Sequence, residues 1–214
     1  MCWNAPVSLS TFCSSVVMSG YLFNRNGHIN DRPLSIFIFW VALMQLFEYF
    51  MWKNMKDHST VSKLAYITTI MQPFVLSASL YYFYTTKGQT PLYLFVMFFS
   101  AVQACAATYY AFRPENKSSE WLSEKGTNGH LIWWYKKNEE KIPFIARVDA
   151  LYFVTLVAAV LLIKTNQSYV YLIVMLVSYI LTSKFYGEEC GSLWCWVVNL
   201  IAMLSIVMPS IKGL

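Results

Sequence analysis

The chain has few charged side chains and few histidines. Only 13% of its 214 residues are Asp, Glu, Lys or Arg, whereas 57% are hydrophobic and 18% are aromatic. Soluble globular domains carry about 25% charged residues, so this composition excludes an ordinary soluble domain and indicates an integral membrane protein. The three histidines, His28, His58 and His130, fall in loops, and no His, Cys or Asp spacing matches a zinc or di-iron site. We therefore expect no metal and no other cofactor.

The sequence also lacks the motifs of several common functions. It has no P-loop, no glycine-rich nucleotide fingerprint and no GxSxG nucleophile elbow. A retinal protein needs a lysine deep in a late helix, but Lys164 and Lys184 fall at the ends of apolar segments, which excludes a rhodopsin. The DRY and NPxxY signatures of receptors are absent, and no threefold repeat or PQ dipeptide supports a sugar transporter. Function must therefore be inferred from the placement of the polar residues.

Long apolar segments are the main feature that is present. A run of about 20 apolar residues spans the hydrocarbon core of a bilayer. Seven segments meet this requirement: residues 7–23, 34–52, 64–85, 91–112, 143–163, 169–185 and 190–211. The sequence therefore predicts an all-α, polytopic integral membrane protein whose single domain, residues 1–214, is a bundle of seven transmembrane helices.

The first and sixth of these segments are the shortest, so six helices with one re-entrant segment is the alternative. The first segment lacks a basic n-region and a small-residue cleavage site. We therefore expect it to be retained as the first helix rather than removed as a signal peptide.

Prolines mark the expected ends of these helices. Pro33, Pro91 and Pro143 fall in first turns, where a missing N–H is tolerated, and Pro114 follows the fourth segment. Pro73 lies inside the third segment, where it removes a backbone hydrogen bond and should kink the helix. This kink is either a packing detail or a hinge.

The longest connection is the loop at residues 113–142. Its segment HLIWWYKK, residues 130–137, places paired tryptophans beside paired lysines, a pattern typical of the lipid headgroup layer. We expect this segment to be interfacial, and an ordinary extramembrane turn of helix is the alternative.

Lysine and arginine are more frequent in the loops on the N-terminal side of the predicted bundle, which favours a cytosolic N-terminus. Basic loops beside anionic lipid account for the net charge of +5, so we expect the bilayer and no nucleic acid as a partner. A homo-oligomer is left open. With a cytosolic N-terminus, Cys2, Cys190 and Cys195 are reduced thiols, whereas with a lumenal one a Cys2–Cys190 bridge is the alternative.

Polar residues gather in the half of the predicted bundle that contains the N-terminus. In and just before the first segment, Asn4, Ser8, Thr11, Ser15 and Ser19 are spaced along one helical face. The other candidate site residues come from five further segments: Gln45, Glu48, Gln72, Gln103, Arg147, Asp149 and Asn199. Because charged and amide side chains are costly in lipid, we expect these groups to face the interior at one depth.

Glu48 carries the functional hypothesis. A carboxylate at that depth needs protein or water around it, so we expect Arg147 or Asp149 nearby, with Arg147 to Glu48 as the preferred ion pair. Arg147 and Asp149 are two residues apart and point different ways around their helix. The remaining amides would complete a hydrogen-bonded ring: Gln45, Gln72, Gln103 and Asn199.

Three stretches of the chain are notable: MCWNAPVSLSTF at residues 1–12, MQLFEYFMW at residues 44–52 and GSLWCW at residues 191–196. In these stretches the chain resembles uncharacterised multi-span membrane proteins of large DNA viruses and of algae and other protists. The resemblance covers short motifs spread over most of the chain, and it implies no activity. It includes Asn4, Gln45, Glu48 and Cys195.

The working hypothesis is passage or recognition of a small polar solute, an ion or a proton. Glu48 would be the charged or proton-accepting group, Arg147 its partner or an anion contact, and the amides orienting groups. One alternative is a structural or assembly subunit whose polar residues specify packing only. Another is an intramembrane enzyme acting on a lipid headgroup, but Cys190 and Cys195 have no evident activating base, so we favour a function without catalysis.

Overall fold

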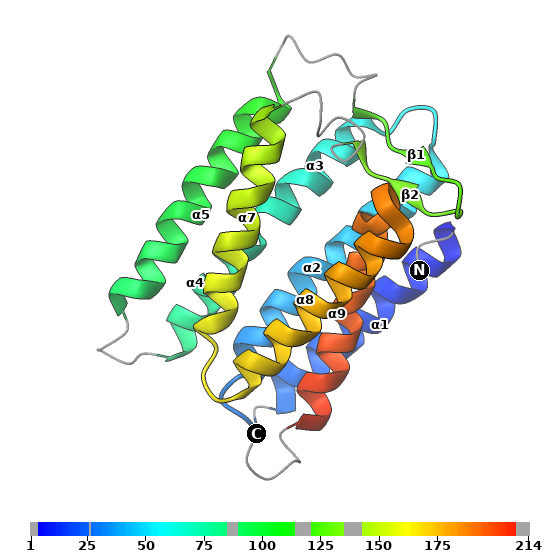
Figure 1. Cartoon of the computed structure of the whole chain (residues 1–214). Helices are drawn as coiled ribbons and strands as arrows, with labels where there is room; N and C mark the ends of the chain where they lie inside the picture. Colours follow the sequence, from blue (N-terminus) through cyan, green and yellow to red (C-terminus); the bar gives the residue numbers. More distant parts are fainter. Residues whose placement is uncertain (1–3, 26, 85–89, 114–120, 135–142, 209–214) are drawn as a thin grey trace.

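The protein is a bundle of α-helices with one small β-hairpin at an end (Figure 1). The structure is a computed structural model that describes residues 4–25, 27–84, 90–113, 121–134 and 143–208. These residues include eight α-helices: α1 (Ala5–Arg25), α2 (Asp31–Lys53), α3 (Ser59–Ile70), α4 (Gln72–Tyr84), α5 (Thr90–Ala111), α7 (Pro143–Leu161), α8 (Gln167–Tyr186) and α9 (Cys190–Val207). The short helix η2 (Gly187–Glu189) joins α8 to α9, and strand β1 (Glu124–Lys125) pairs with β2 (Leu131–Ile132). The prediction of an all-α fold is confirmed.

The helices are long and apolar enough to match membrane spans. In the described part of the chain, four helices have the length and hydropathy of a span, and the bent pair α3–α4 makes a fifth if it counts as one. Their outer surfaces carry large hydrophobic side chains, such as Val17 at 70%, Phe98 at 64% and Ile180 at 60% exposure. Apolar surface of this extent suits lipid better than water. The length and the apolar outer surface of these helices therefore support integration into a membrane.

Apart from the bent pair α3 and α4, which continue one another, successive helices run in opposite directions along the bundle (Figure 1). α1 packs chiefly on α2 and α9, α5 packs on α4 and α7, and α8 packs on α9 and α7. The turn from α2 to α3 and the turn from α8 to α9 both contact the hairpin, at what we call the hairpin end. The turns from α1 to α2 and from α7 to α8 lie with the last residues of α9 at the opposite end.

The third predicted segment is broken at Met71. α3 ends at Ile70, α4 begins at Gln72, and the two helices are bent by 45° relative to each other. Pro73 has no N–H to donate to the carbonyl of Thr69, so the helix cannot continue straight. The kink predicted from Pro73 is confirmed, and it places Gln72 at the bend.

The polar stripe predicted for α1 is buried against neighbouring helices. Ser8, Thr11, Ser15 and Ser19 all belong to the buried face of α1. The Ser19 hydroxyl donates a hydrogen bond of 2.7 Å to the carbonyl of Ser35 on α2. Small side chains on such a face allow two helix backbones to approach closely, and their hydroxyls find partners in protein. The contacts of this face are therefore those of helix packing.

Residues 121–134 form the hairpin. Its strands are antiparallel, with Glu124 opposite Ile132. The turn between them ends at Gly129, whose φ of 86° lies in the left-handed region that glycine adopts without a steric penalty. The sequence predicted a loop at residues 113–142, and residues 121–134 of it form this hairpin.

Aromatic side chains attach the hairpin to the helices. Trp121 is 1% exposed, and Trp133 and Trp134 are each 2% exposed. Trp121 and Trp134 pack edge-on against Tyr66 of α3, with ring centroids 6.1 and 5.3 Å away. The placement of residues 130–137 in a headgroup layer stays a prediction, but both tryptophans of that segment are buried in protein. They contribute to the core rather than to the surface.

Candidate functional site

The carboxylate of Glu48 lies inside the protein, near the end of α2. The residue is 0% exposed, and its Oε1 accepts a hydrogen bond of 3.0 Å from Nε1 of Trp133. Gln45, one turn earlier on the same helical face, is 1% exposed. The two polar residues predicted to share an interior face of α2 therefore do so. The hairpin supplies the indole N–H that Glu48 accepts.

His58 holds the first strand of the hairpin. This histidine follows α2 and is 2% exposed. Its Nε2 lies 2.9 Å from the backbone nitrogen of Ser123, and its Nδ1 lies 3.0 Å from the carbonyl oxygen of Asn54. A backbone N–H can only donate, so Nε2 is the acceptor and Nδ1 carries the proton. Burial lowers the pKa of His58, because the imidazolium form loses its hydration. The neutral imidazole is therefore the form that this geometry needs.

Glu189 holds the turn of the hairpin. Its carboxylate is 3% exposed and accepts hydrogen bonds from the backbone nitrogens of Asn128 at 2.9 Å and His130 at 3.1 Å. Gly126 lies so close that a Cβ atom at this position would be 2.3 Å from Oε1 of Glu189. Glycine is therefore required for the turn to close over the carboxylate. Burial also lowers the pKa of His130, whose ring packs edge-on against Tyr186.

These three contacts share one chemical pattern. In each of them the hairpin supplies N–H donors, and a titratable side chain of the helical part accepts: His58, Glu189 or Glu48. The hairpin thus closes the end of the bundle above Glu48. Sequence analysis missed this arrangement because it read the Trp133–Trp134 pair as a membrane-surface signal and set His58 aside as a loop residue.

Gln72 and Gln103 of the predicted ring of amides form their hydrogen bonds with α7 rather than with each other. The Gln72 oxygen accepts a hydrogen bond of 2.6 Å from the Tyr152 hydroxyl of α7. Gln103 donates to the carbonyl of Val148 at 2.7 Å and accepts from Thr155 at 3.3 Å, both also on α7. These partners differ from those that the ring required, because each amide lies next to a different helix and satisfies the nearest backbone or hydroxyl group.

Asn199 belongs to another part of the bundle. Its Oδ1 accepts a hydrogen bond of 2.7 Å from the Ser15 hydroxyl of α1. Its Nδ2 has no hydrogen-bond partner among the described residues, although the side chain is buried. Asn199 thus links α9 to the polar stripe of α1, and it is not part of a network with Gln72 or Gln103.

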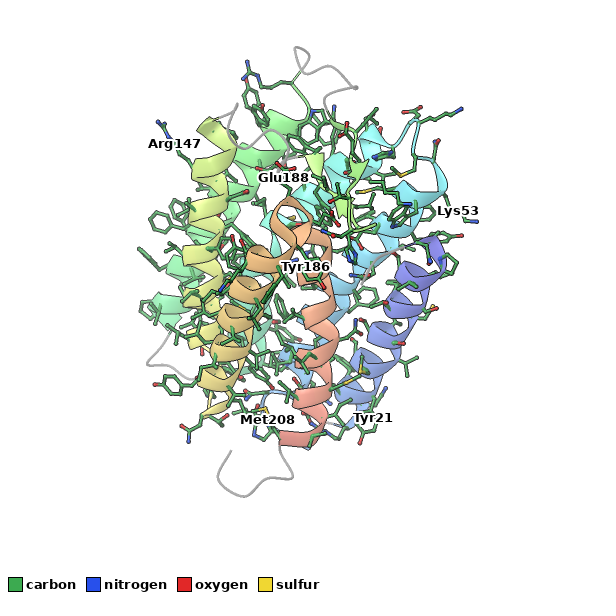
Figure 2. The ribbon with its side chains drawn as sticks, turned by 45° about the vertical axis from the view of Figure 1, so that its right-hand side comes forward. Tyr21, Lys53, Arg147, Tyr186, Glu188 and Met208 are labelled. Carbon is green, nitrogen blue, oxygen red and sulfur yellow. The ribbon has the colours of Figure 1, made fainter. Side chains whose placement is uncertain are left out.

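The predicted ion pair between Arg147 and Glu48 is wrong. Arg147 is exposed at the start of α7 and points away from the bundle (Figure 2), whereas Glu48 is buried and accepts from Trp133. An arginine within the first turns of a helix can reach solvent with its long side chain, so it does not need an interior partner. Asp149 is half-buried and interacts electrostatically with the Tyr66 hydroxyl. The predicted divergence of Arg147 and Asp149 is confirmed.

Asn4 has a local role. It is exposed, and its Oδ1 accepts a hydrogen bond of 3.0 Å from the backbone nitrogen of Val7. This is the geometry of a residue that caps the first turn of a helix. Asn4 therefore lies outside the interior site that the sequence placed it in. Cys2 and the side chains of Cys190 and Cys195 lie outside the described residues, and Cys13 and Cys105 are free and exposed.

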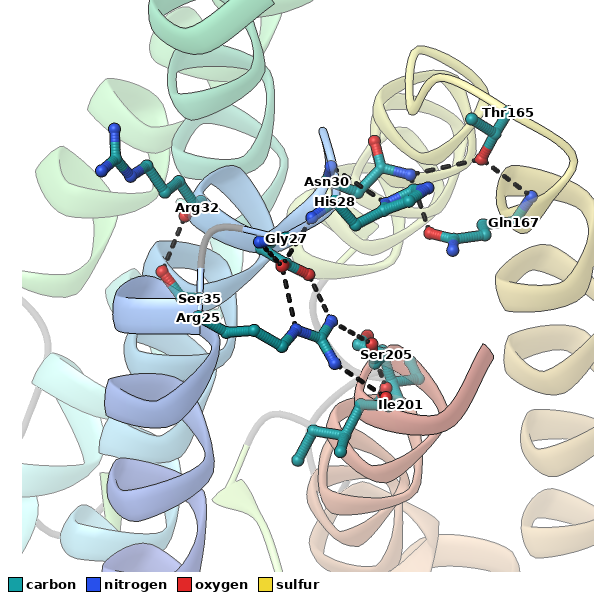
Figure 3. A network of polar contacts seen from close by, with 12 residues as sticks. Arg25, Gly27, His28, Asn30, Arg32, Ser35, Thr165, Gln167, Ile201 and Ser205 are labelled. Atoms are coloured by element: carbon teal, nitrogen blue, oxygen red, sulfur yellow. Dashed lines mark hydrogen bonds and ion pairs between the residues drawn. The ribbon is translucent and has the colours of Figure 1, made fainter. Parts of the chain in front are cut away.

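The opposite end of the bundle contains a second polar cluster, which sequence analysis missed (Figure 3). Nε of Arg25 lies 3.0 Å from Oδ2 of Asp31, and the same carboxylate accepts from the backbone nitrogens of Gly27 and His28, each at 2.9 Å. Arg25 also donates to the carbonyls of Ser205 and Ile206, at 2.9 and 2.7 Å. The pair joins the α1–α2 turn to the end of α9.

Asn30 extends this cluster to the α7–α8 turn. Its amide nitrogen donates to Oε1 of Gln167 at 2.7 Å and to the carbonyl of Lys164 at 2.8 Å, and its oxygen accepts from the Tyr84 hydroxyl. Thr165 in this turn has a φ of 74°, which is unusual for a β-branched residue. The signal available in the sequence was the Arg25 and Asp31 pair at two adjacent helix ends, but the α9 carbonyls that Arg25 binds are about 180 residues away.

The interior has little free volume beside the predicted amides. A cavity of about 20 Å³ is lined by Gln72 and by apolar side chains of α2, α7, α8 and α9. It has room for about one water molecule. A groove of about 480 Å³ lies on the outside between α4 and α5, next to Cys105. Neither space includes Glu48, so contact with this carboxylate depends on movement of the groups that cover it.

No protein-family model, no curated protein and no solved structure matches this chain. The function must therefore be argued from the site itself. The fold and the site together define a bundle of apolar helices whose interior carboxylate is covered by a hairpin.

Proposed function

We propose that the protein is a seven-span membrane protein that binds or translocates a small polar solute, an ion or a proton at Glu48. The N-terminus, and with it the hairpin end, would face the cytosol. The resemblance to multi-span proteins of large DNA viruses and protists bears on the multi-span architecture alone, since it implies no activity. Gln45 is the neighbouring amide that would orient the bound species.

The full burial of Glu48 at a position reached by the hairpin carries this proposal. An ionisable side chain within a span is costly and is more often functional than structural. Glu48 is 0% exposed, and its hydrogen-bond donor Trp133 belongs to a loop element rather than to a helix of the bundle. A donor on such an element moves with the hairpin rather than with a membrane-spanning helix. The carboxylate can then meet a solute or a proton from the hairpin end.

Proton flux in reconstituted vesicles tests the proposal. Vesicles loaded with a pH-sensitive dye and placed under a potassium diffusion potential should acidify or alkalinise faster with the protein than without it. Glu48→Gln keeps the size of the side chain and removes its charge, so it should abolish the added flux. Glu124→Gln is the matched control, because Glu124 is exposed on the hairpin and should leave flux unchanged. Isotope uptake of small cations extends the same comparison to ions.

A purely structural role is the second candidate, and one observation favours it. Gln72, Gln103 and Asn199 each join two helices through hydrogen bonds with protein groups. Such bonds specify packing without binding anything. If Glu48→Gln lowers the thermal stability but leaves flux and ligand binding unchanged, the structural role replaces transport.

A further inference from the structure

The attachment of the hairpin depends on the protonation state of one buried histidine. Nε2 of His58 accepts the backbone N–H of Ser123, while Nδ1–H donates to the Asn54 carbonyl. A proton on Nε2 would place two N–H donors against each other at a nitrogen–nitrogen distance of 2.9 Å. The hydrogen bond would be lost, and a cation would be left in a site that is 2% exposed.

We propose that the hairpin is a proton-operated lid, which leaves the helix ends when His58 is protonated and so opens the way to Glu48. The part of this inference that concerns access to Glu48 rests on the proposed function, whereas the movement of the hairpin does not. Trp133 and Ser123 belong to the same hairpin, so loss of the His58 contact weakens the element that also covers Glu48.

The neighbouring charged groups do not offset the lowering of the His58 pKa by burial. Asp57, next to His58 in the chain, raises the pKa of the imidazole, but burial lowers it by more. The other charged side chains on the adjoining stretches of α2, the α2–α3 turn, α3 and the hairpin are Lys53, Lys56 and Lys63, then Glu124 and Lys125. Lys63 lies over the Trp121 ring, and Glu124 and Lys125 are exposed to solvent. The closed hairpin therefore disfavours the imidazolium form.

The direction of the pH dependence follows from linkage. In the closed state the pKa of His58 lies below its ordinary value of 6.5 because the ring is buried. In the open state the ring is in solvent and regains the ordinary value. The open state therefore binds the proton more readily. The closed hairpin has its full stability above pH 6.5 and loses stability relative to the open hairpin as the pH falls below that value.

Hydrogen exchange of the hairpin in the full-length protein, embedded in lipid nanodiscs, tests this proposal. Exchange of the peptide that covers residues 121–134 is measured at pH 7.5 and pH 5.5 and corrected for the intrinsic rate with the unfolded peptide. Protonation of His58 should raise the fraction of open hairpin by up to about tenfold between the two pH values, because pH 5.5 is one unit below the ordinary pKa of the released ring. His58→Gln retains a donor and an acceptor but does not titrate, so it should reduce the rise to the part that His130 contributes.

Two further variants separate His58 from the other histidines. His28→Gln at the opposite end should respond like the unchanged protein. His130→Gln should keep the part of the rise that comes from His58, although burial also lowers the pKa of His130 and this hairpin residue adds its own part. The assignment is overturned if the unchanged protein shows no rise, if His58→Gln leaves the rise at its full size, or if His130→Gln removes the rise completely.

A second measurement covers the case in which His58→Gln does not fold. Carbon-13 NMR of the histidine rings in the unchanged protein reports the tautomer directly. At pH 7.5 His58 should be neutral with the proton on Nδ1, and it should stay neutral below pH 6.5 as long as the hairpin is protected from exchange. An ordinary titration at 6.5 with a protected hairpin would overturn the proposal. Neither measurement depends on flux, so the lid can stand if Glu48→Gln leaves flux unchanged, and it can fall while the proposed function stands.

Discussion

Trp133 and Glu48 are 85 positions apart in the chain, yet the indole nitrogen of one lies 3.0 Å from the carboxylate of the other. This hydrogen bond fixes the hairpin over the end of α2 and connects a loop residue to the most buried acid of the bundle. Replacing Trp133 by Phe keeps most of the aromatic packing but removes the donor. Removing one partner of a buried hydrogen bond costs about 1–3 kcal/mol, so we expect the free energy of unfolding to fall by about this amount.

Thermal unfolding in detergent, followed by circular dichroism, measures the effect of Trp133→Phe. Tyr109→Phe is the control, because Tyr109 is 74% exposed and its hydroxyl is not part of the site. An equal small change in both variants would contradict the importance of the Trp133–Glu48 hydrogen bond.

Gly126→Ala should destabilise the turn of the hairpin. The added Cβ would lie 2.3 Å from Oε1 of Glu189, so either the turn or the carboxylate has to move. A double-mutant cycle with Glu189→Ala tests this cause, because removing the carboxylate also removes the clash. We expect Gly126→Ala to cost less in the Glu189→Ala background than in the unchanged protein.

The matched control for Gly126→Ala is Gly20→Ala. A Cβ atom at Gly20 meets nothing within 4 Å, and alanine is favoured over glycine inside a helix by about 1 kcal/mol. This variant should be neutral or slightly more stable. Additive effects in the Gly126 and Glu189 cycle would show that the close approach does not matter.

Asp31→Asn should lower stability at the opposite end of the bundle. Asp31 is 2% exposed and accepts from Arg25 and from two backbone N–H groups. Loss of its charge leaves the guanidinium of Arg25 without its ion-pair partner, for an expected cost of about 2–3 kcal/mol. Arg32→Gln removes an exposed charge on the same helix turn and should change stability by no more than about 0.5 kcal/mol. Chemical or thermal unfolding of both variants makes the comparison, and similar values for the two would contradict it.

Gln103→Leu should separate packing from function. The amide of Gln103 donates to the Val148 carbonyl and accepts from Thr155, so its loss should cost about 1–2 kcal/mol of stability. If Glu48 is the binding group, flux should stay at the level of the unchanged protein at a temperature where both are folded. A loss of flux without a loss of stability would move Gln103 into the functional site.

The helices could be predicted because long apolar runs leave few alternatives. The seven predicted segments coincide with α1, α2, the pair α3–α4, α5, α7, α8 and α9. Pro73 predicted the break because the chemistry of a missing N–H is local. The shared face of Gln45 and Glu48 followed from helical spacing alone. Each of these features depends on neighbours within a few residues.

The partners of the polar side chains could not be predicted in the same way. Charge complementarity suggested Arg147 for Glu48, but a helix end lets an arginine reach solvent, and an indole from a distant loop is the donor instead. Likewise Asn199 was expected to meet other amides, and it meets Ser15 of α1. Such pairings depend on which helices become neighbours and on how each helix is rotated about its axis. Neither property can be derived from the sequence of one segment.

The contacts of Arg25 have a consequence for biosynthesis. Two of its donors bind carbonyls of Ser205 and Ile206, about 180 residues further along the chain. A growing polypeptide cannot complete this junction until translation has delivered α9. Until then the guanidinium of Arg25 has Asp31 beside it in the chain but lacks its two carbonyl acceptors.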